Sequence, residues 1–166
     1  MEKYYITTPI YYVNDKPHIG HAYTTILADT ISRFRALIGE KPTFLTGLDE
    51  HGLKVQQAAE NNGKEPQDHC DSMAPAFIDL WKKLNINYSD FIRTTEHRHT
   101  KIVQEILTKV HESNDIYMDE YEGWYSISEE RFITQKELDS GQFGEVKQIK
   151  EKNYFFKMSK YQTALI

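Results

Sequence analysis

The chain has 166 residues, 39% of them hydrophobic and 27% charged, a composition that is typical of folded globular domains and argues against disorder. Its net charge of −5 repels polyanions, so contact with nucleic acid would need a local patch. The single cysteine, Cys70, excludes a disulfide framework and a metal site built from several thiolates. No apolar run approaches the roughly 20 residues of a membrane span, so we expect a cytoplasmic protein without a membrane segment.

The amino-terminal part of the chain alternates predicted strands and helices. Residues 3–8 are rich in β-branched and aromatic side chains, which predicts a strand followed by a loop to Pro17. Residues 18–38 predict a helix, because apolar residues recur at helical spacing and Gly39 can end it. The predicted apolar face consists of Ile19, Ala22, Tyr23, Ile26, Leu27, Ile31, Phe34, Leu37 and Ile38. Further elements are predicted at residues 42–46 (strand), 47–52 (polar turn) and 53–62 (helix). Such alternation is typical of a parallel α/β sheet.

The later part of the chain changes character. Two more apolar stripes at helical spacing predict helices that pack into a core. They are Met73, Phe77, Leu80, Trp81 and Leu84, and Ile102, Val103, Ile106, Leu107 and Val110. From Ile116 onward, short aromatic and β-branched runs are separated by the turn-prone residues 139–144. This pattern predicts an antiparallel β element that follows the α/β part.

The strongest local signal is Pro17-His18-Ile19-Gly20-His21, at the start of the first predicted helix. A helix amino terminus attracts phosphate oxygens through its unpaired N–H groups, and His18 and His21 add side-chain donors. Gly20 lacks a Cβ, so a purine could approach the backbone there. The arrangement suits ATP. The two histidines could equally be ordinary polar residues at a helix start, or a metal-binding pair.

A second cluster, Thr46-Gly47-Leu48-Asp49-Glu50-His51-Gly52, follows the second predicted strand. Open α/β sheets bind ligands at the carboxyl ends of their strands, so this cluster and the histidine pair are predicted to share one edge. Asp49 could accept a substrate ammonium in a charge-assisted contact. A solvated turn or a metal site are the alternatives for this segment.

Several segments together resemble the class I aminoacyl-tRNA synthetases, and among them the methionine-specific members. They are TTPIYYVNDKPHIGHAYTTILAD (7–29), TGLDEHG (46–52), DFIRTTEHRH (90–99), DEYEGWYS (119–126) and NYFFKMSKYQ (153–162). The resemblance covers essentially the whole chain. It implies that residues 1–114 form the first half of a Rossmann-like, HUP-type parallel-sheet domain. Residues 115–166 would then begin the β-rich connective-peptide insert.

The resemblance also implies an activity: L-methionine and ATP, with Mg²⁺, give methionyl-adenylate, and the methionyl group then passes to tRNA(Met). It assigns catalysis to His18 and His21, which bind ATP together with Gly20. Methionine binding falls to Pro9, Ile10, Tyr12 and Asp49, with His51 a further candidate. Tyr11 and Asn14 match the family without an assigned role. No stable protein partner can be inferred.

Two features depart from the family. Lys157-Met158-Ser159-Lys160-Tyr161 looks like the mobile KMSKS loop, but it ends in Tyr and belongs to the insert, so we do not identify it as that loop. Many relatives carry a zinc-binding cysteine pair just after the residue that matches Tyr125. Ser126 and Glu129 occupy those positions, so we expect a knuckle without structural zinc.

Two other functions compete with this interpretation. A small adenylyltransferase of the same nucleotide-binding class would use the histidine pair but would not need Tyr12 and Asp49. Alternatively, the chain is a folded fragment that binds methionine or RNA weakly and catalyses nothing, because the crevice of such a sheet lies between its two halves. We therefore expect these 166 residues to be incomplete for catalysis alone.

Overall fold

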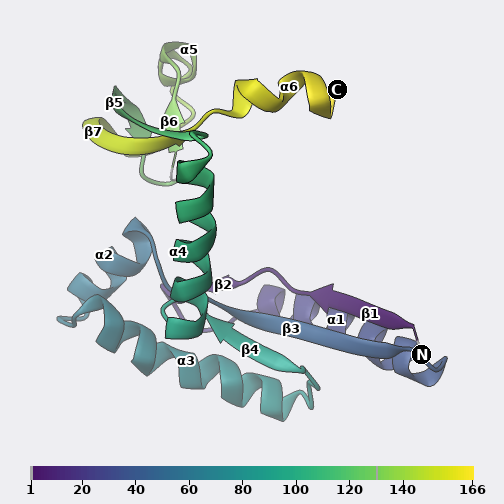
Figure 1. Cartoon of the computed structure of the whole chain (residues 1–166). Coiled ribbons are helices and arrows are strands. Elements are labelled where there is room, and N and C mark those ends of the chain that lie inside the picture. Colours follow the sequence, from purple (N-terminus) through teal and green to yellow (C-terminus); the bar gives the residue numbers. More distant parts are fainter. Residues whose placement is uncertain (1, 130) are drawn as a thin grey trace. The chain divides into compact units, whose positions relative to one another are not determined.

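A computed structural model describes residues 2–129 and 131–166, which form two compact units, Met1–Lys101 and Ile102–Ile166 (Figure 1). The boundary expected after residue 114 stays a prediction, because compactness does not define where an insert begins.

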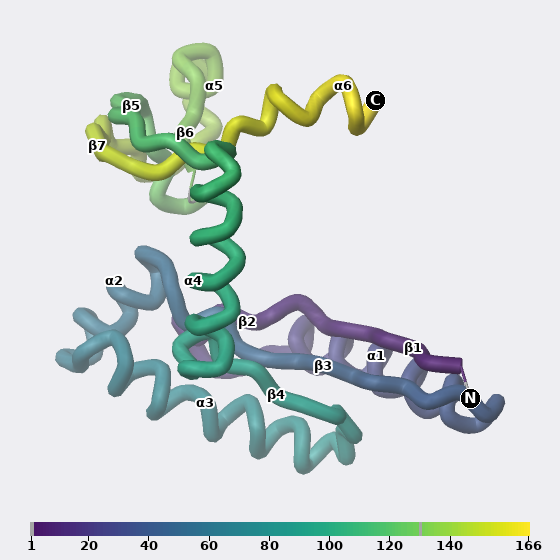
Figure 2. The backbone as a smooth tube through the Cα atoms, viewed as in Figure 1, coloured from purple at the N-terminus to yellow at the C-terminus, as the bar shows by residue number. Residues whose placement is uncertain are grey.

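The first unit is built on a parallel sheet, as predicted. Its strands are β1 (Lys3–Thr7), β2 (Tyr11–Tyr12), β3 (Lys41–Asp49) and β4 (Asp90–Arg93). The register pairs β1 with the first half of β3, β2 with its last two residues, and β4 with its middle. β3 is therefore central: β1 and β2 follow each other along one side and β4 lies on the other (Figures 1 and 2).

The sheet extends beyond the predicted strands at three points. β2 lies inside the predicted loop, β3 continues to Asp49 through the predicted turn, and β4 was not predicted. Gly47 explains why the turn signal was misleading. A Cβ on Gly47 would lie 2.1 Å from the backbone oxygen of Ile92, so the glycine allows β4 to approach β3 closely.

Helix α1 (Ile19–Leu37) was predicted, but its apolar face is not the face that is buried. Ile19 and Leu37 are each 86% exposed, and most other large apolar residues of the stripe are exposed as well. The buried residues are instead Thr25, Ala28, Asp29 and Ser32. Polar residues fill this face because they have partners there: Thr25 contacts Tyr11, and Asp29 accepts a bond from the Asn87 backbone (2.8 Å).

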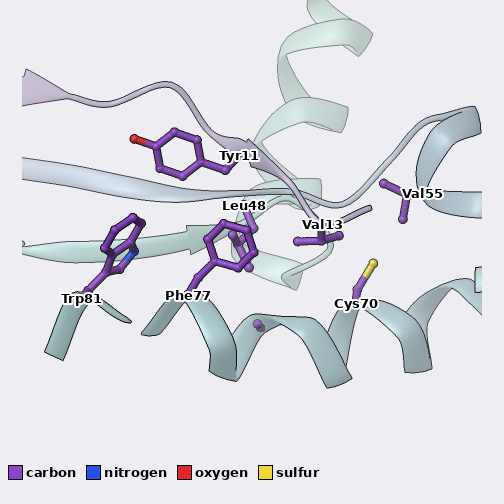
Figure 3. Close-up of a cluster of buried hydrophobic side chains, with 8 residues drawn as sticks. Tyr11, Val13, Leu48, Val55, Cys70, Phe77 and Trp81 are labelled. Atoms are coloured by element: carbon purple, nitrogen blue, oxygen red, sulfur yellow. The ribbon is translucent and has the colours of Figure 1, made fainter. Parts of the chain in front are cut away.

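Helices α2 (Leu53–Asn61) and α3 (Pro66–Lys83) follow, and α3 supplies four of the eight residues of the buried cluster, including Phe77 and Trp81 of its predicted apolar stripe. Figure 3 shows its side chains facing β2 and β3. The buried cluster consists of Tyr11, Val13, Leu48, Val55, Cys70, Ala74, Phe77 and Trp81. The loop that contains β2 is thus packed directly on α3.

The second unit is an antiparallel sheet in the order β6-β5-β7, which confirms the predicted change of architecture. Its strands are β5 (Ile116–Ser126), β6 (Arg131–Ile133) and β7 (Val146–Phe156). The short helices α5 (Gln135–Asp139), η1 (Met158–Tyr161) and α6 (Gln162–Leu165) were not predicted. Helix α4 (His97–Glu112) joins the two units along the chain and buries no residue. The expectation that its apolar stripe is a core face is therefore wrong. Among the described residues, no helix is long and apolar enough to cross a membrane.

Candidate active site

The two histidines of the first motif form the cap of helix α1. The backbone N–H of Gly20 donates to Nδ1 of His18, and the backbone N–H of His18 donates to Nδ1 of His21, each at 3.1 Å. This is a capping box in which histidine replaces the usual Ser or Thr and Glu. Two of the helix's otherwise unpaired N–H groups are satisfied by the imidazoles.

This cap determines which ring nitrogens face outward as donors. Because both Nδ1 atoms accept hydrogen bonds, the neutral rings of His18 and His21 carry their protons on Nε2. The rings stack with centroids 3.9 Å apart. Burial, and then the charge of His18, lower the pKa of His21. The pair therefore presents Nε2–H groups as donors.

Gly20 is required by the same cap. A Cβ on Gly20 would lie 2.9 Å from Cε1 and 3.1 Å from Nδ1 of His18. The imidazole folds over the glycine, and a methyl group would push it away. Glycine at this position is therefore explained by the cap itself. The sequence suggested a different reason, close approach of a purine.

Tyr11 lies behind His21 and fixes its ring. The two ring centroids are 4.7 Å apart, and the Tyr11 hydroxyl contacts Oγ1 of Thr25 at 2.9 Å. Phe77 of α3 contacts both rings. Sequence reasoning gave Tyr11 no role, although an aromatic residue in a segment expected to be loop was a usable signal.

Four predicted site residues surround one cavity of about 460 Å³. Its lining comprises Ile10, Tyr11, Tyr12, Asn14, Asp15, Lys16, His18 and His21. Ile10, Tyr12, His18 and His21 are thus brought together, while Pro9 and Gly20 lie next to lining residues in the chain. Lys16, which sequence reasoning missed, adds a positive charge; a lysine two residues before the first histidine was the signal.

Asp49 and His51 lie at the end of β3 and just after it, and Asp49 does not line this cavity. Asp49 is the last residue of β3 and pairs in register with Tyr12. His51 is not among the lining residues; it belongs to a second cavity of about 350 Å³, lined by Glu50, His51, Glu65, Pro66, Gln67, Cys70 and Thr95. The structure therefore places Asp49 beside Tyr12 and gives His51 a separate environment.

Glu50, between these two residues, is the charged group that sequence reasoning overlooked. Its carboxylate is fully buried and accepts bonds from Nε of Arg93 (2.6 Å) and from the Thr95 hydroxyl. Arg93 also contacts Asp71 at 2.5 Å. Burial and then Glu50 raise the pKa of the nearby Cys70 thiol to about 11, so this thiol stays protonated and unreactive at neutral pH.

Hydrogen bonds hold two segments of the second unit that the sequence singled out. Ser126 is buried, and its hydroxyl accepts from the Glu129 backbone (3.3 Å) and contacts the Ser128 hydroxyl (3.1 Å). In residues 2–129 and 131–166, no group of three or more His, Cys, Asp or Glu side chains could hold a metal ion. Within the KMSKY segment, Lys160 and Tyr161 both contact the buried Asp115 at 2.5 Å.

Comparison with known sequences identifies the family. The profile described as "tRNA synthetases class I (M)" matches residues 4–142. A methionine–tRNA ligase of Nostoc sp. is 49% identical over 96% of this chain, which spans 31% of that relative. A methionine–tRNA ligase of Thermotoga maritima is 49% identical over 99% of the chain, which spans 27% of it. The chain thus spans less than a third of the length of these relatives.

Solved structures agree with this result. The methionyl-tRNA synthetase of Mycobacterium tuberculosis, solved in complex with methionyl-adenylate, superposes on 99% of the chain with a TM-score of 0.92 and 39% identity. The chain covers 34% of that structure. The parallel and antiparallel sheets therefore match those of a known fold, and the chain belongs to the family of class I tRNA synthetases of the (M) type.

Proposed function

We propose that this chain carries the ATP- and methionine-binding part of a methionine–tRNA ligase, which makes methionyl-adenylate and transfers the methionyl group to tRNA(Met). The observation that carries the proposal is the cavity that brings His18 and His21 together with Ile10 and Tyr12. The Nostoc and Thermotoga maritima relatives, both methionine–tRNA ligases, support it.

In the first step, a carboxylate oxygen of methionine attacks the α-phosphorus of ATP, and pyrophosphate leaves. ATP enters as its magnesium complex. His18 and His21 donate Nε2–H groups to phosphate oxygens, Gly20 keeps the His18 ring in place, and the start of α1 adds its dipole. Lys16, which also lines the cavity, adds positive charge near the phosphates. Catalysis then rests on positioning and on charge stabilisation.

Methionine lies on the opposite side of the cavity in this proposal. Ile10 and Tyr12, with Pro9 beside them, form an apolar and aromatic wall that suits a flexible thioether. Asp49, next to Tyr12 in the sheet, accepts the α-ammonium. In the second step a ribose hydroxyl of the tRNA attacks the activated carbonyl, and AMP leaves.

These residues alone are proposed to be weak or inactive in the full reaction. The large apolar side chains on the outer face of α1, among them Ile19, Tyr23 and Phe34, are exposed in this chain. The relatives are more than three times as long as the part that this chain matches. The other half of the site would lie in the remainder of such a protein.

The test is methionine-dependent exchange of pyrophosphate into ATP. It is run on this chain and on a chimera in which the chain replaces the matching segment of the Thermotoga maritima relative, each with His21→Ala as control. We expect exchange by the chimera that is specific for methionine and is lost in the variant. Exchange with another carboxylic acid would refute the methionine assignment but keep the ATP site, and ATP turnover without any amino acid would favour an adenylyltransferase.

Two further expectations belong to the same proposal. The insert is proposed to fold without zinc. The hydrogen bonds of the Ser126 hydroxyl would hold the turn that zinc-binding cysteines hold in many relatives. Elemental analysis of the purified chain should then find no stoichiometric zinc, and one zinc per chain would refute this. A cytoplasmic location follows from a role in translation and can be read from fractionation of the source cells.

A further inference from the structure

Thr94, the first residue after β4, contacts two consecutive groups of the Asp49–His51 segment. Its hydroxyl accepts the backbone N–H of Glu50 at 3.0 Å and lies 3.0 Å from Nδ1 of His51. The hydroxyl can give its single hydrogen to that nitrogen, which leaves the His51 proton on Nε2. Thr94 is buried, so water does not replace these bonds.

The two neighbours of Thr94 hold the same segment through its side chain. Arg93 and Thr95 both donate to the buried carboxylate of Glu50. Asp71 of α3 accepts from the other arm of the Arg93 guanidinium. Arg93, Thr94 and Thr95 therefore form hydrogen bonds with Glu50 and His51, the two residues that follow Asp49. None of the three lines the cavity formed by Ile10, Tyr12 and the histidines.

We propose that Arg93–Thr94–Thr95, which we call the bracket, is a positioning element that sets the affinity for methionine through Asp49. The inference rests on the proposed function. Asp49 is the last residue of β3, so sheet pairing fixes its backbone only from the preceding side. The bracket fixes the residue that follows, and with it the direction of the Asp49 carboxylate. A shift of about 1 Å in such a group can cost on the order of 100-fold in rate.

The effect should be selective for one substrate. The ATP side of the cavity is held by the cap of α1 and by Tyr11, and neither contacts the bracket in the hydrogen bonds described for this chain. Loss of the bracket should therefore raise KM for methionine and leave KM for ATP in place. A residue that only stabilises the fold would change both constants, or neither.

The experiment compares isosteric variants in the Thermotoga maritima chimera. Thr94→Val keeps the shape and removes the hydroxyl, and Thr94→Ser keeps the hydroxyl. We expect Thr94→Val to raise KM for methionine at least about tenfold with KM for ATP changed less than about twofold, and Thr94→Ser to restore most of the affinity. An equal change in both constants, or an unchanged KM for methionine in a folded Thr94→Val protein, overturns the proposal.

A second pair of variants tests the Glu50 arm of the bracket. Arg93→Met should raise KM for methionine, and Glu50→Gln in the same chain should recover part of it, because no buried carboxylate then lacks a charged partner. Arg98→Met is the matched control: Arg98 pairs with the half-exposed Asp90, and its loss should change neither KM. Failure of the unmodified chimera to exchange with methionine would refute the proposed function itself. Exchange with unaltered constants in Thr94→Val and Arg93→Met would refute the bracket alone.

Discussion

The histidine cap has two roles: it stabilises the start of α1, and it holds the His18 ring in the site. Gly20→Ala should separate them, because we expect it to disable the site while the fold stays nearly as stable. The added Cβ would lie 2.9 Å from Cε1 of His18, closer than carbon atoms approach without displacement. The imidazole must therefore rotate away, which breaks its bond to the Gly20 N–H and its stack on His21.

The stability terms nearly cancel. Loss of the cap costs about 0.5–2 kcal/mol. Alanine in place of glycine in a helix gains up to about 1 kcal/mol. We therefore expect the free energy of unfolding, measured by urea denaturation of this chain, to change by about 1 kcal/mol or less. Pyrophosphate exchange by the chimera should instead fall on the order of 100-fold, the usual effect of losing one aligned donor to a transition-state oxygen.

The control is Gly144→Ala, in the second unit, where the new Cβ would have its nearest neighbour 4.0 Å away at the Ser128 hydroxyl. That variant should keep full exchange. Normal exchange by Gly20→Ala would refute the reasoning, because it would mean that the His18 ring need not lie where the cap holds it. A large loss of stability would refute it too, since the fold would then depend on the cap more than the cancelling terms allow.

Three further predictions concern other parts of the chain. Because the pKa of His21 is lowered in the folded chain by burial and then by His18, its contribution to stability is complete above the unfolded pKa of about 6.5. That contribution is lost as pH falls from 6.5 toward the lowered folded pKa, and His21→Gln should flatten this part of a denaturation profile. Gly47→Ala should destabilise the first unit by about 3 kcal/mol or more, because its Cβ would overlap the Ile92 backbone oxygen and separate β3 from β4; wild-type stability in urea would contradict this. Lys160→Met should leave KM for ATP in the exchange assay unchanged, because Lys160 is paired with Asp115; a large rise in that KM would mean that KMSKY does act on ATP.

Parts of the fold were predictable because local chemistry and tertiary structure agree. The strand at residues 3–8, the helix after His18 and the apolar stripe of α3 all appear in the structure, and the hairpins of the insert follow their aromatic runs. The histidine motif was recognisable because its residue types and its place at a helix start are both encoded locally. No local pattern identifies the substrates, and the resemblance to the methionine-specific synthetases suggested them.

The buried face of α1 could not be read from periodicity. Hydrophobic spacing selected Ile19, Tyr23 and Phe34, all exposed in this chain, whereas the side chains that face the sheet include Thr25 and Asp29. A period predicts that one face of a helix differs from the other, and the usual assumption is that the apolar face is buried. Here the polar residues are buried because each has a partner far away in sequence, and periodicity carries no information about such partners.

The role of Glu50 was hidden for a related reason. In sequence it is one acid in a polar turn, between the two residues that drew attention, Asp49 and His51. Its partners lie more than forty positions away in the segment after β4, a strand that the sequence did not predict. Without β4, nothing indicates that Arg93 reaches Glu50, so the polar turn predicted for residues 47–52 gave no sign of a buried ion pair.

Long-range polar pairs recur along this whole edge of the sheet, and their placement has a physical reason. The Thr8 and Thr46 hydroxyls contact each other at 2.7 Å, and His69 donates from Nε2 to the Val13 carbonyl at 2.8 Å. Tyr11 with Thr25, and Thr94 with the Glu50 backbone, complete the series.

Loops that must stay open to substrates cannot be enclosed by apolar packing on all sides. Buried hydrogen bonds fix them instead, since such bonds specify direction and are costly to leave unmade. The residues proposed to face the substrates are therefore held largely by polar contacts behind them, and conservative substitutions among those contacts should affect substrate affinity more than overall stability.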